Sequence, residues 1–256
     1  MLYRVEHLRG YTIRATDGEI GTVDDLLFDD RSWMVRYIVA DTGGWLSSRR
    51  VLLSPSVLER PDRVALAVPV RLTREKVRES PRIDADAPVT REQEELLSRH
   101  YGWAAWWSEP ATSVGLLGTG PLYEAPLTAA PINPPLSEPE TEAAAAAEAR
   151  LRSAHEITDF KIATTDGEIG HVEDLLIDED GWIVRYIVVD TRNWLPGRKV
   201  LIAPSWVTGV DWLDEKVRVK VTRDKVKGSP EYAPDKEIDR RYEHDLHTWY
   251  GHAPYW

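Results

Sequence analysis

The 256-residue chain contains no cysteine. This excludes disulfides, thiolate metal sites and a cysteine nucleophile, and it is consistent with a reducing compartment. No stretch reaches the roughly 18 apolar residues that a membrane-spanning helix needs, and the longest charge-free stretch near the middle, residues 111–123, is interrupted by glycine and proline. Residues 1–6 lack the basic and apolar pattern of a signal peptide. We therefore expect a soluble, cytoplasmic protein without a transmembrane segment.

An excess of positive charge is also missing. The formal net charge is −11. Proteins that bind nucleic acids gain much of their affinity from basic residues that neutralise phosphates. The acidic total therefore predicts no nucleic-acid partner.

One stretch of the chain occurs twice. Residues 16–57 align with residues 165–206 at a constant offset of 149 positions, and 26 of the 42 aligned pairs are identical without a gap. The register continues to the chain end, where Trp107 corresponds to the terminal Trp256. A duplication of this size predicts two domains of the same fold.

Each copy has the pattern of short β-strands joined by tight turns. Tyr11, Ile13 and Ala15 alternate with polar residues, as in a half-buried strand. Gly21, inside the next predicted strand, indicates a bulge or a close approach of two backbone segments. Five or six such strands, joined by turns too short for crossover helices, predict an antiparallel all-β fold. Closure of each sheet into a small barrel would remove its exposed edges.

The order of these motifs resembles the PRC-barrel family. The motifs are Thr-Asp-Gly-Glu-Ile-Gly, Val-x-Asp-Leu-Leu, Trp-x-Val-Arg-Tyr-Ile-Val-x-Asp-Thr, and Trp-Leu before a strand that ends in Pro-Ser, and the resemblance covers about residues 5–76 and 153–225. The family includes the cytoplasmic part of the photosynthetic reaction-centre H subunit and the C-terminal domain of a ribosome-maturation factor. The resemblance implies a small β-barrel used for protein–protein assembly. It implies no catalytic residue and no cofactor.

Composition divides the chain into five parts. We expect a first PRC-type barrel over residues 1–81, a helical, aromatic-ended appendage over 82–107, a Pro/Ala-rich linker over 108–152, a second barrel over 153–230 and a second such appendage over 231–256. Thr90 and Gln93 have the spacing of a capping box before a helix predicted over residues 91–100. The two tandem barrels are expected to form a pseudo-dimer within one chain.

A pair of opposite charges recurs in the third predicted strand of each copy. Arg36 and Asp41 correspond to Arg185 and Asp190. One interpretation is a structural ion pair that fixes the following Asp-Thr loop, and the other is a site for an anionic ligand. The presence of the pair in both copies favours the structural interpretation.

Two clusters of possible metal ligands have simpler explanations. Acidic residues group near two turns, where Asp is favoured because its side chain bonds the local backbone. Their spacing does not fit a calcium loop. These residues are Asp24, Asp25, Asp29 and Asp30, repeated as Glu173, Asp174, Asp178 and Glu179, with Asp180 added. His244 and His247 are three apart on a predicted helix, with His252 nearby, but the first copy has no histidine at these places. We therefore predict no metal site.

The aromatic residues are unusual, with eleven Trp and ten Tyr against two Phe. Trp33/Trp182 and Trp45/Trp194 recur, and we expect them in or over the barrel cores. Trp and Tyr are enriched at the centres of protein interfaces. We therefore predict a partner-binding role for the aromatic residues of the two tails, namely Trp103, Trp106, Trp107, Trp249, Tyr255 and Trp256. The alternative is that each tail folds back onto its own barrel.

These observations favour a non-enzymatic assembly or adaptor protein that binds a protein partner. The resemblance to the H subunit implies peripheral association at the cytoplasmic face of a membrane or photosynthetic complex. The alternative is a stress-related small-ligand or ion sensor, with the Asp-Gly turns or a cleft between the barrels as its site. No sequence resembles a nucleophile elbow, so no enzymatic activity is expected.

Overall fold

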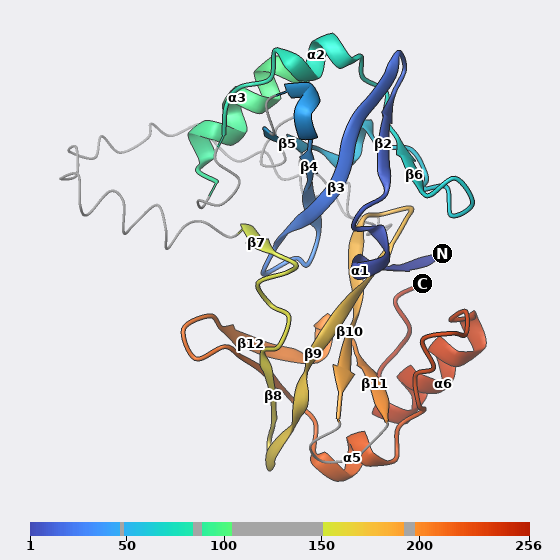
Figure 1. The fold of residues 1–256 in the computed structure, drawn as a ribbon. Helices are drawn as coiled ribbons and strands as arrows, with labels where there is room; N and C mark the ends of the chain where they lie inside the picture. Colours follow the sequence, from blue (N-terminus) through green and yellow to red (C-terminus); the bar gives the residue numbers. More distant parts are fainter. Residues whose placement is uncertain (47–48, 84–88, 104–150, 192–197) are drawn as a thin grey trace, which may run out of the picture. The chain divides into compact units, whose positions relative to one another are not determined.

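The computed structural model describes residues 1–46, 49–83, 89–103, 151–191 and 198–256. It contains two β-sheets, one for each repeat (Figure 1). The chain divides into two compact units, residues 1–79 with 150–256 and residues 80–149. Both sheets belong to the first unit.

The sheet of the first repeat has six strands. Its order is β5-β4-β3-β2-β6, with β7 paired to β3. The strands are β2 (Thr12–Ala15), β3 (Gly18–Asp29), β4 (Val35–Asp41), β5 (Arg50–Leu53), β6 (Ala67–Pro69) and β7 (Leu151–Ser153). The pairs are antiparallel except for β2 and β6, which are parallel.

The sheet of the second repeat has seven strands in the same arrangement. Its order is β11-β10-β9-β8-β13-β12, with β1 paired to β9 and only β8 and β13 parallel. The strands are β1 (Leu2–Arg4), β8 (Lys161–Thr164), β9 (Gly167–Asp178), β10 (Ile183–Asp190), β11 (Lys199–Ile202), β12 (Val207–Asp211) and β13 (Lys216–Val219). The all-β prediction is confirmed. In the described residues, however, the end strands of neither sheet pair to close a barrel, and the antiparallel pattern fails at one pair in each sheet.

Short helices complete each repeat. The first unit contains α1 (Val5–Leu8), α2 (Arg74–Arg78), α5 (Arg223–Lys227), α6 (Arg240–Tyr250) and the single-turn segments η1 (Gly43–Leu46), η2 (Pro55–Val57) and η4 (Pro204–Trp206). The predicted Asp-Gly turns hold α2 and α5, since Asp17 and Asp166 accept the first backbone N–H of each helix at 2.7 and 2.8 Å. In the second unit, α3 (Arg91–Tyr101) begins at the predicted capping box of Thr90 and Gln93.

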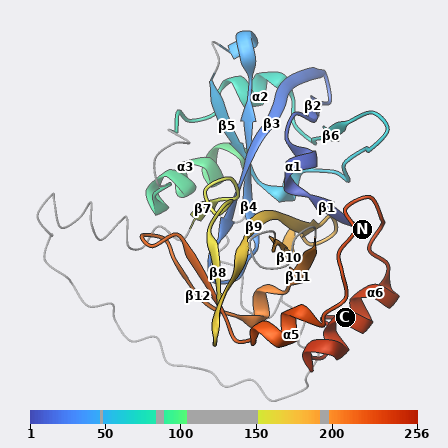
Figure 2. The same cartoon turned by 60° about the horizontal axis from the view of Figure 1, so that its bottom comes forward.

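The two repeats exchange their first strands. β1, from the first repeat, pairs with β9 of the second, and β7, from the second, pairs with β3 of the first (Figures 1 and 2). The registers are equivalent, because Leu2 lies opposite Asp178 and Leu151 lies opposite Asp29. Residues 151–152, which the sequence analysis assigned to the linker, therefore belong to a strand. The exchange makes the expected pseudo-dimer a single unit with pseudo-twofold symmetry.

Two tryptophans lie at the centre of this symmetry. Trp33 and Trp182 are each 6% exposed and adopt positive φ angles of 58° and 48°, uncommon for a residue with a side chain. Each tryptophan carbonyl accepts a backbone N–H from the other repeat. The Val35 N–H donates to the Trp182 carbonyl at 2.7 Å, and the Val184 N–H donates to the Trp33 carbonyl at 2.8 Å. The strained backbone is thus tied to contacts that only the paired repeats can make.

Carboxylates from the acidic clusters support the exchanged strands. Buried Asp174 accepts a hydrogen bond from Arg4 Nε at 2.8 Å, and the equivalent Asp25 accepts one from Ser153 Oγ. Burial raises the pKa of both carboxyl groups. Asp29 instead accepts bonds within its own turn, as predicted. The acidic clusters are therefore partly turn residues and partly contacts between the repeats.

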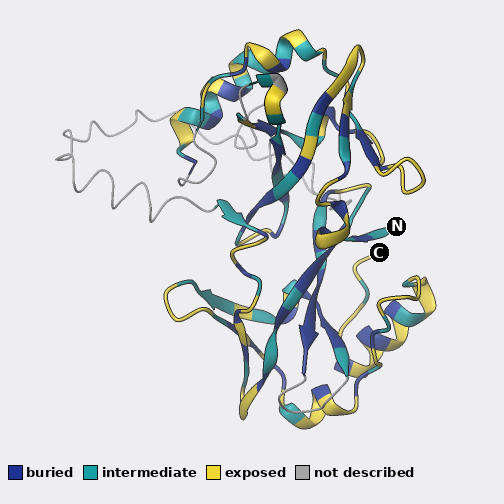
Figure 3. Cartoon of the chain, viewed as in Figure 1, coloured by how far each residue is buried: buried dark blue, intermediate teal, exposed yellow. Residues whose placement is uncertain are grey.

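The core follows the two long hairpins. Each of β3, β4, β9 and β10 contributes five buried apolar residues, and these strands are largely dark blue in Figure 3, whereas the outer face of α6 is exposed. Gly21 and Gly170 make the hairpins possible, because a Cβ at either position would lie 2.0 Å from a backbone carbonyl oxygen, of Asp41 or Asp190. The predicted close approach at Gly21 is confirmed.

We expect Gly170→Ala to destabilise the protein by about 3 kcal/mol, since a backbone oxygen occupies the space and the residue has a φ of +144°. Gly209→Ala is the matched control, because nothing lies within 4 Å of its Cβ position. We expect its effect to stay within about 0.5 kcal/mol. Urea unfolding measures both, and equal midpoints for the two variants would contradict the close approach.

Candidate partner-binding site

Buried polar residues anchor helix α6 to the second sheet. Glu243 and His247, four positions apart on one face of α6, are each 3% exposed. Tyr186 on β10 places its hydroxyl 3.1 Å from Glu243 Oε1 and 3.0 Å from His247 Nε2. Because a buried polar group is costly unless it is hydrogen-bonded, this cluster fixes the position of α6.

The same residues hold the C-terminal tail. The Tyr255 hydroxyl donates to Glu243 Oε1 at 2.7 Å, and His247 Nδ1 lies 3.0 Å from the carbonyl oxygen of Ala253. Burial, together with Glu243, raises the pKa of Tyr255 to about 12. The tail of the second repeat thus folds back onto its own sheet, one of the two arrangements considered from the sequence.

Two guanidinium groups pack against the tail aromatics. Arg185 lies 4.1 Å from the ring centre of Tyr255, and Arg240 lies 4.4 Å from that of Trp256. Arg240 also donates to Glu243 Oε2 at 3.1 Å. Cation–π contacts of this kind favour a fixed ring orientation.

The anchored aromatics keep a substantial exposed surface. Trp249 is 39% exposed, Tyr255 37% and Trp256 52%. Trp249 is held by a hydrogen bond from Nε1 to the carbonyl oxygen of Lys225, 2.8 Å away. Its ring occupies the space above Gly228, where a Cβ would lie 2.4 Å from a ring carbon. These three predicted residues therefore combine a fixed position with partial exposure.

The tail of the first repeat is described only in part. In the second unit, the Trp103 ring stacks on Tyr101 at a centroid distance of 4.2 Å. Trp106, Trp107, Trp194 and the side chain of Trp45 lie outside the described residues.

The predicted ion pair between Arg185 and Asp190 is wrong. Arg185 pairs with Asp178, with Nη2 and Oδ2 3.0 Å apart. Five residues along an extended strand separate Arg185 from Asp190 by roughly 16 Å, and the same spacing separates Arg36 from Asp41. Asp41 fixes its loop directly, by accepting the backbone N–H of Gly43 at 2.9 Å.

The C-terminal histidines have separate contacts. His247 belongs to the anchor of α6, His252 stacks on Trp206 with ring centres 5.3 Å apart, and the His244 side chain is 63% exposed. Within the described ranges, no three His, Cys, Asp or Glu side chains are grouped so that they could hold a metal ion.

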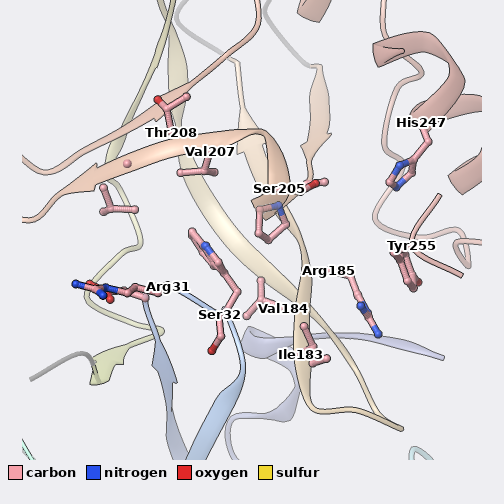
Figure 4. Close-up of a pocket in the computed structure, with 16 residues that line it drawn as sticks. Arg31, Ser32, Ile183, Val184, Arg185, Ser205, Val207, Thr208, His247 and Tyr255 are labelled. Atoms are coloured by element: carbon pink, nitrogen blue, oxygen red, sulfur yellow. The ribbon is translucent and has the colours of Figure 1, made fainter. Parts of the chain in front are cut away.

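A cleft with a volume of about 740 Å³ lies beside the tail, between the repeats (Figure 4). The turn after β3 contributes Arg31, Ser32 and Trp33, and the second repeat contributes residues of β10, η4 and β12. In Figure 4, Arg31 and Ser32 lie at one end, and Arg185, His247 and Tyr255 lie at the other. A cleft between the barrels is the alternative site predicted from the sequence, but no sequence pattern indicates these residues.

The fold agrees with the comparison with known families. The PRC-barrel domain profile matches residues 1–68 and 150–226. The chain belongs to the PRC-barrel domain family and contains two copies of the domain. A search of curated proteins found no match. In the described part of the chain, no helix is long and apolar enough to cross a membrane.

The buried His247 predicts a pH-dependent stability. Burial lowers its pKa below the ordinary 6.5, an effect that His252 reinforces and Glu243 opposes. In the folded state His247 therefore stays neutral at a pH where the unfolded chain already binds a proton. Its contribution to stability is present above pH 6.5 and is lost as the pH falls through the lowered pKa.

We expect the melting temperature to fall between pH 7.5 and pH 5, and His247→Asn to reduce that fall. The exposed His244→Asn serves as the control and should keep the wild-type pH dependence. An identical pH dependence in all three proteins, measured by scanning calorimetry, would show that His247 does not couple the tail to pH.

Proposed function

We propose that this protein is a non-enzymatic assembly or adaptor protein that binds a protein partner through the aromatic residues of its C-terminal tail. The observation that carries this proposal is the combination of anchoring and exposure at Trp249, Tyr255 and Trp256. A ring that is already fixed loses little conformational entropy on binding, and Trp and Tyr contribute strongly to interfaces.

The proposal extends to location. By likeness to the H subunit named above, the protein acts in the cytoplasm, associated peripherally with the cytoplasmic face of a membrane or photosynthetic complex. Trp106 and Trp107, which correspond to Tyr255 and Trp256 in the repeat, are proposed to contribute an equivalent surface.

A second candidate function is a stress-related small-ligand sensor. The cleft between the repeats favours it, since its volume of about 740 Å³ lies in the range of ligand sites. A ligand that binds only the folded protein would raise the melting temperature.

The adaptor proposal predicts a partner that depends on the tail. The tagged full-length protein is used to capture partners from the soluble and membrane fractions of the source cells, followed by mass spectrometry. We expect Trp256→Ala, the most exposed of the three tail residues, to reduce the yield of a stoichiometric partner at least tenfold, because removal of a central aromatic typically costs about 2 kcal/mol or more.

Leu213→Ala is the matched control, since this side chain is 97% exposed but lies in another loop. It should leave the yield unchanged. If both variants lose the partner to the same extent, the tail is refuted as the binding surface. The same holds if the Trp256→Ala variant has the wild-type melting temperature and still retains the partner.

A further inference from the structure

The two repeats differ at the place that forms the cleft. On the opposite side of the pseudo-twofold axis, Arg60 donates to Asp180 at 2.5 Å and joins the two repeats. At the offset of 149 positions, Gly209 corresponds to Arg60 and Arg31 to Asp180. The cleft side therefore has a glycine and a cation where the other side has a salt bridge.

The cleft meets β12 at the edge of the sheet. β12 is an end strand, and β13 is its one partner strand among the described residues. Four consecutive residues of β12, Val207 to Val210, line the cleft. The pairing of β12 is irregular between Val207 and Gly209 and regular from Gly209 to Asp211. In the regular part side chains alternate between the two faces of the strand, so lining by both Gly209 and Val210 indicates that the backbone edge itself faces the cleft. An open edge of this kind can pair with an added strand.

The charges of the cleft favour an acidic occupant. Asp30 is already engaged, since its Oδ2 accepts a bond from Trp212 Nε1 at 3.2 Å and lies 3.8 Å from Arg152 Nε. Arg185 is paired with Asp178. The exposed Arg31 guanidinium has no hydrogen bond or ion pair within the described residues. The Arg31 guanidinium therefore leaves a positive charge at one end of the cleft, which also has apolar lining residues such as Trp33 and Ile183.

We propose that this cleft holds an extended acidic peptide segment that pairs with the free edge of β12 and places a carboxylate against Arg31. The inference rests on the proposed function, because it states which part of the partner protein is bound. Backbone pairing supplies the orientation, and Arg31 supplies the preference for acidic sequences.

The test uses full-length protein and a fluorescein-labelled heptapeptide of alternating Val and Glu. Fluorescence anisotropy should give a dissociation constant at least tenfold lower than that of the corresponding Val/Lys peptide. Methylation of the backbone nitrogens of the acidic peptide should abolish binding, because it removes the donors for strand pairing. Equal binding of the Lys peptide or of the methylated peptide would overturn the proposal.

Two variants locate the site. The double substitution Arg31→Asp with Gly209→Arg copies the salt bridge of the opposite side and should weaken binding at least tenfold; the space at Gly209 admits a side chain. Arg60→Ala is the control on the opposite side and should leave binding unchanged. Equal affinity of wild type and the double variant, at unchanged melting temperature, would refute the site. So would displacement of the peptide by an equal concentration of glutarate, which would indicate a small-anion site.

The outcome is separable from that of the partner-capture experiment. Peptide binding without a tail-dependent partner would retain the cleft and reject the aromatic tail as the docking surface. A tail-dependent partner without peptide binding would retain the adaptor function and reject the inference.

Discussion

The structure depends on backbone pairing between its two repeats. β1 and β7 each complete the sheet of the opposite repeat, and the carbonyls of Trp33 and Trp182 accept backbone N–H groups across the pseudo-twofold axis. Neither repeat contains all the strands of its own sheet. Trp33 and Trp182 have positive φ angles, an unfavourable backbone conformation that the contacts between the repeats hold in place. The two sheets therefore fold together, within the unit formed by residues 1–79 and 150–256.

A cation–π contact occurs on both sides of the pseudo-twofold axis, although different residues form it. Arg63 lies over Tyr3 at 4.2 Å on one side, and Arg152 lies over Trp212 at 4.5 Å on the other. At equivalent positions the cation and the ring have exchanged places, so the cation–π contact is kept. Elsewhere the symmetry is lost. The salt bridge between Arg60 and Asp180 has no counterpart at Gly209 and Arg31, and this difference distinguishes the cleft from the opposite side.

Much of the fold could be predicted because its determinants are local. Alternation, Asp-Gly turns and the capping box at Thr90 indicate strands, turns and a helix from neighbouring residues. The exchanged strands could not be found in this way. β1 and β7 have three residues each, too few to show an alternation of apolar and polar residues, and their partner strands lie in the other repeat. The partner of Arg185 was misassigned because Asp178 belongs to the neighbouring strand. Alignment of the repeats places Gly209 and Arg31 at the positions of Arg60 and Asp180, so it shows that a salt bridge is missing on the cleft side. This signal could be used only after the structure had shown that Arg60 and Asp180 are in contact.

A designed disulfide tests the central claim, that the repeats pair across the pseudo-twofold axis, most directly. Met34 and Ile183 form an antiparallel bridge on this axis, where paired Cα atoms lie about 5 Å apart, within disulfide range. The chain has no other cysteine, so the double substitution Met34→Cys with Ile183→Cys allows a single intramolecular disulfide. We expect mild oxidation to form it nearly completely in the monomer, as judged by non-reducing electrophoresis and peptide mass spectrometry. Free thiols, or disulfides only between chains, would contradict the pairing of the repeats.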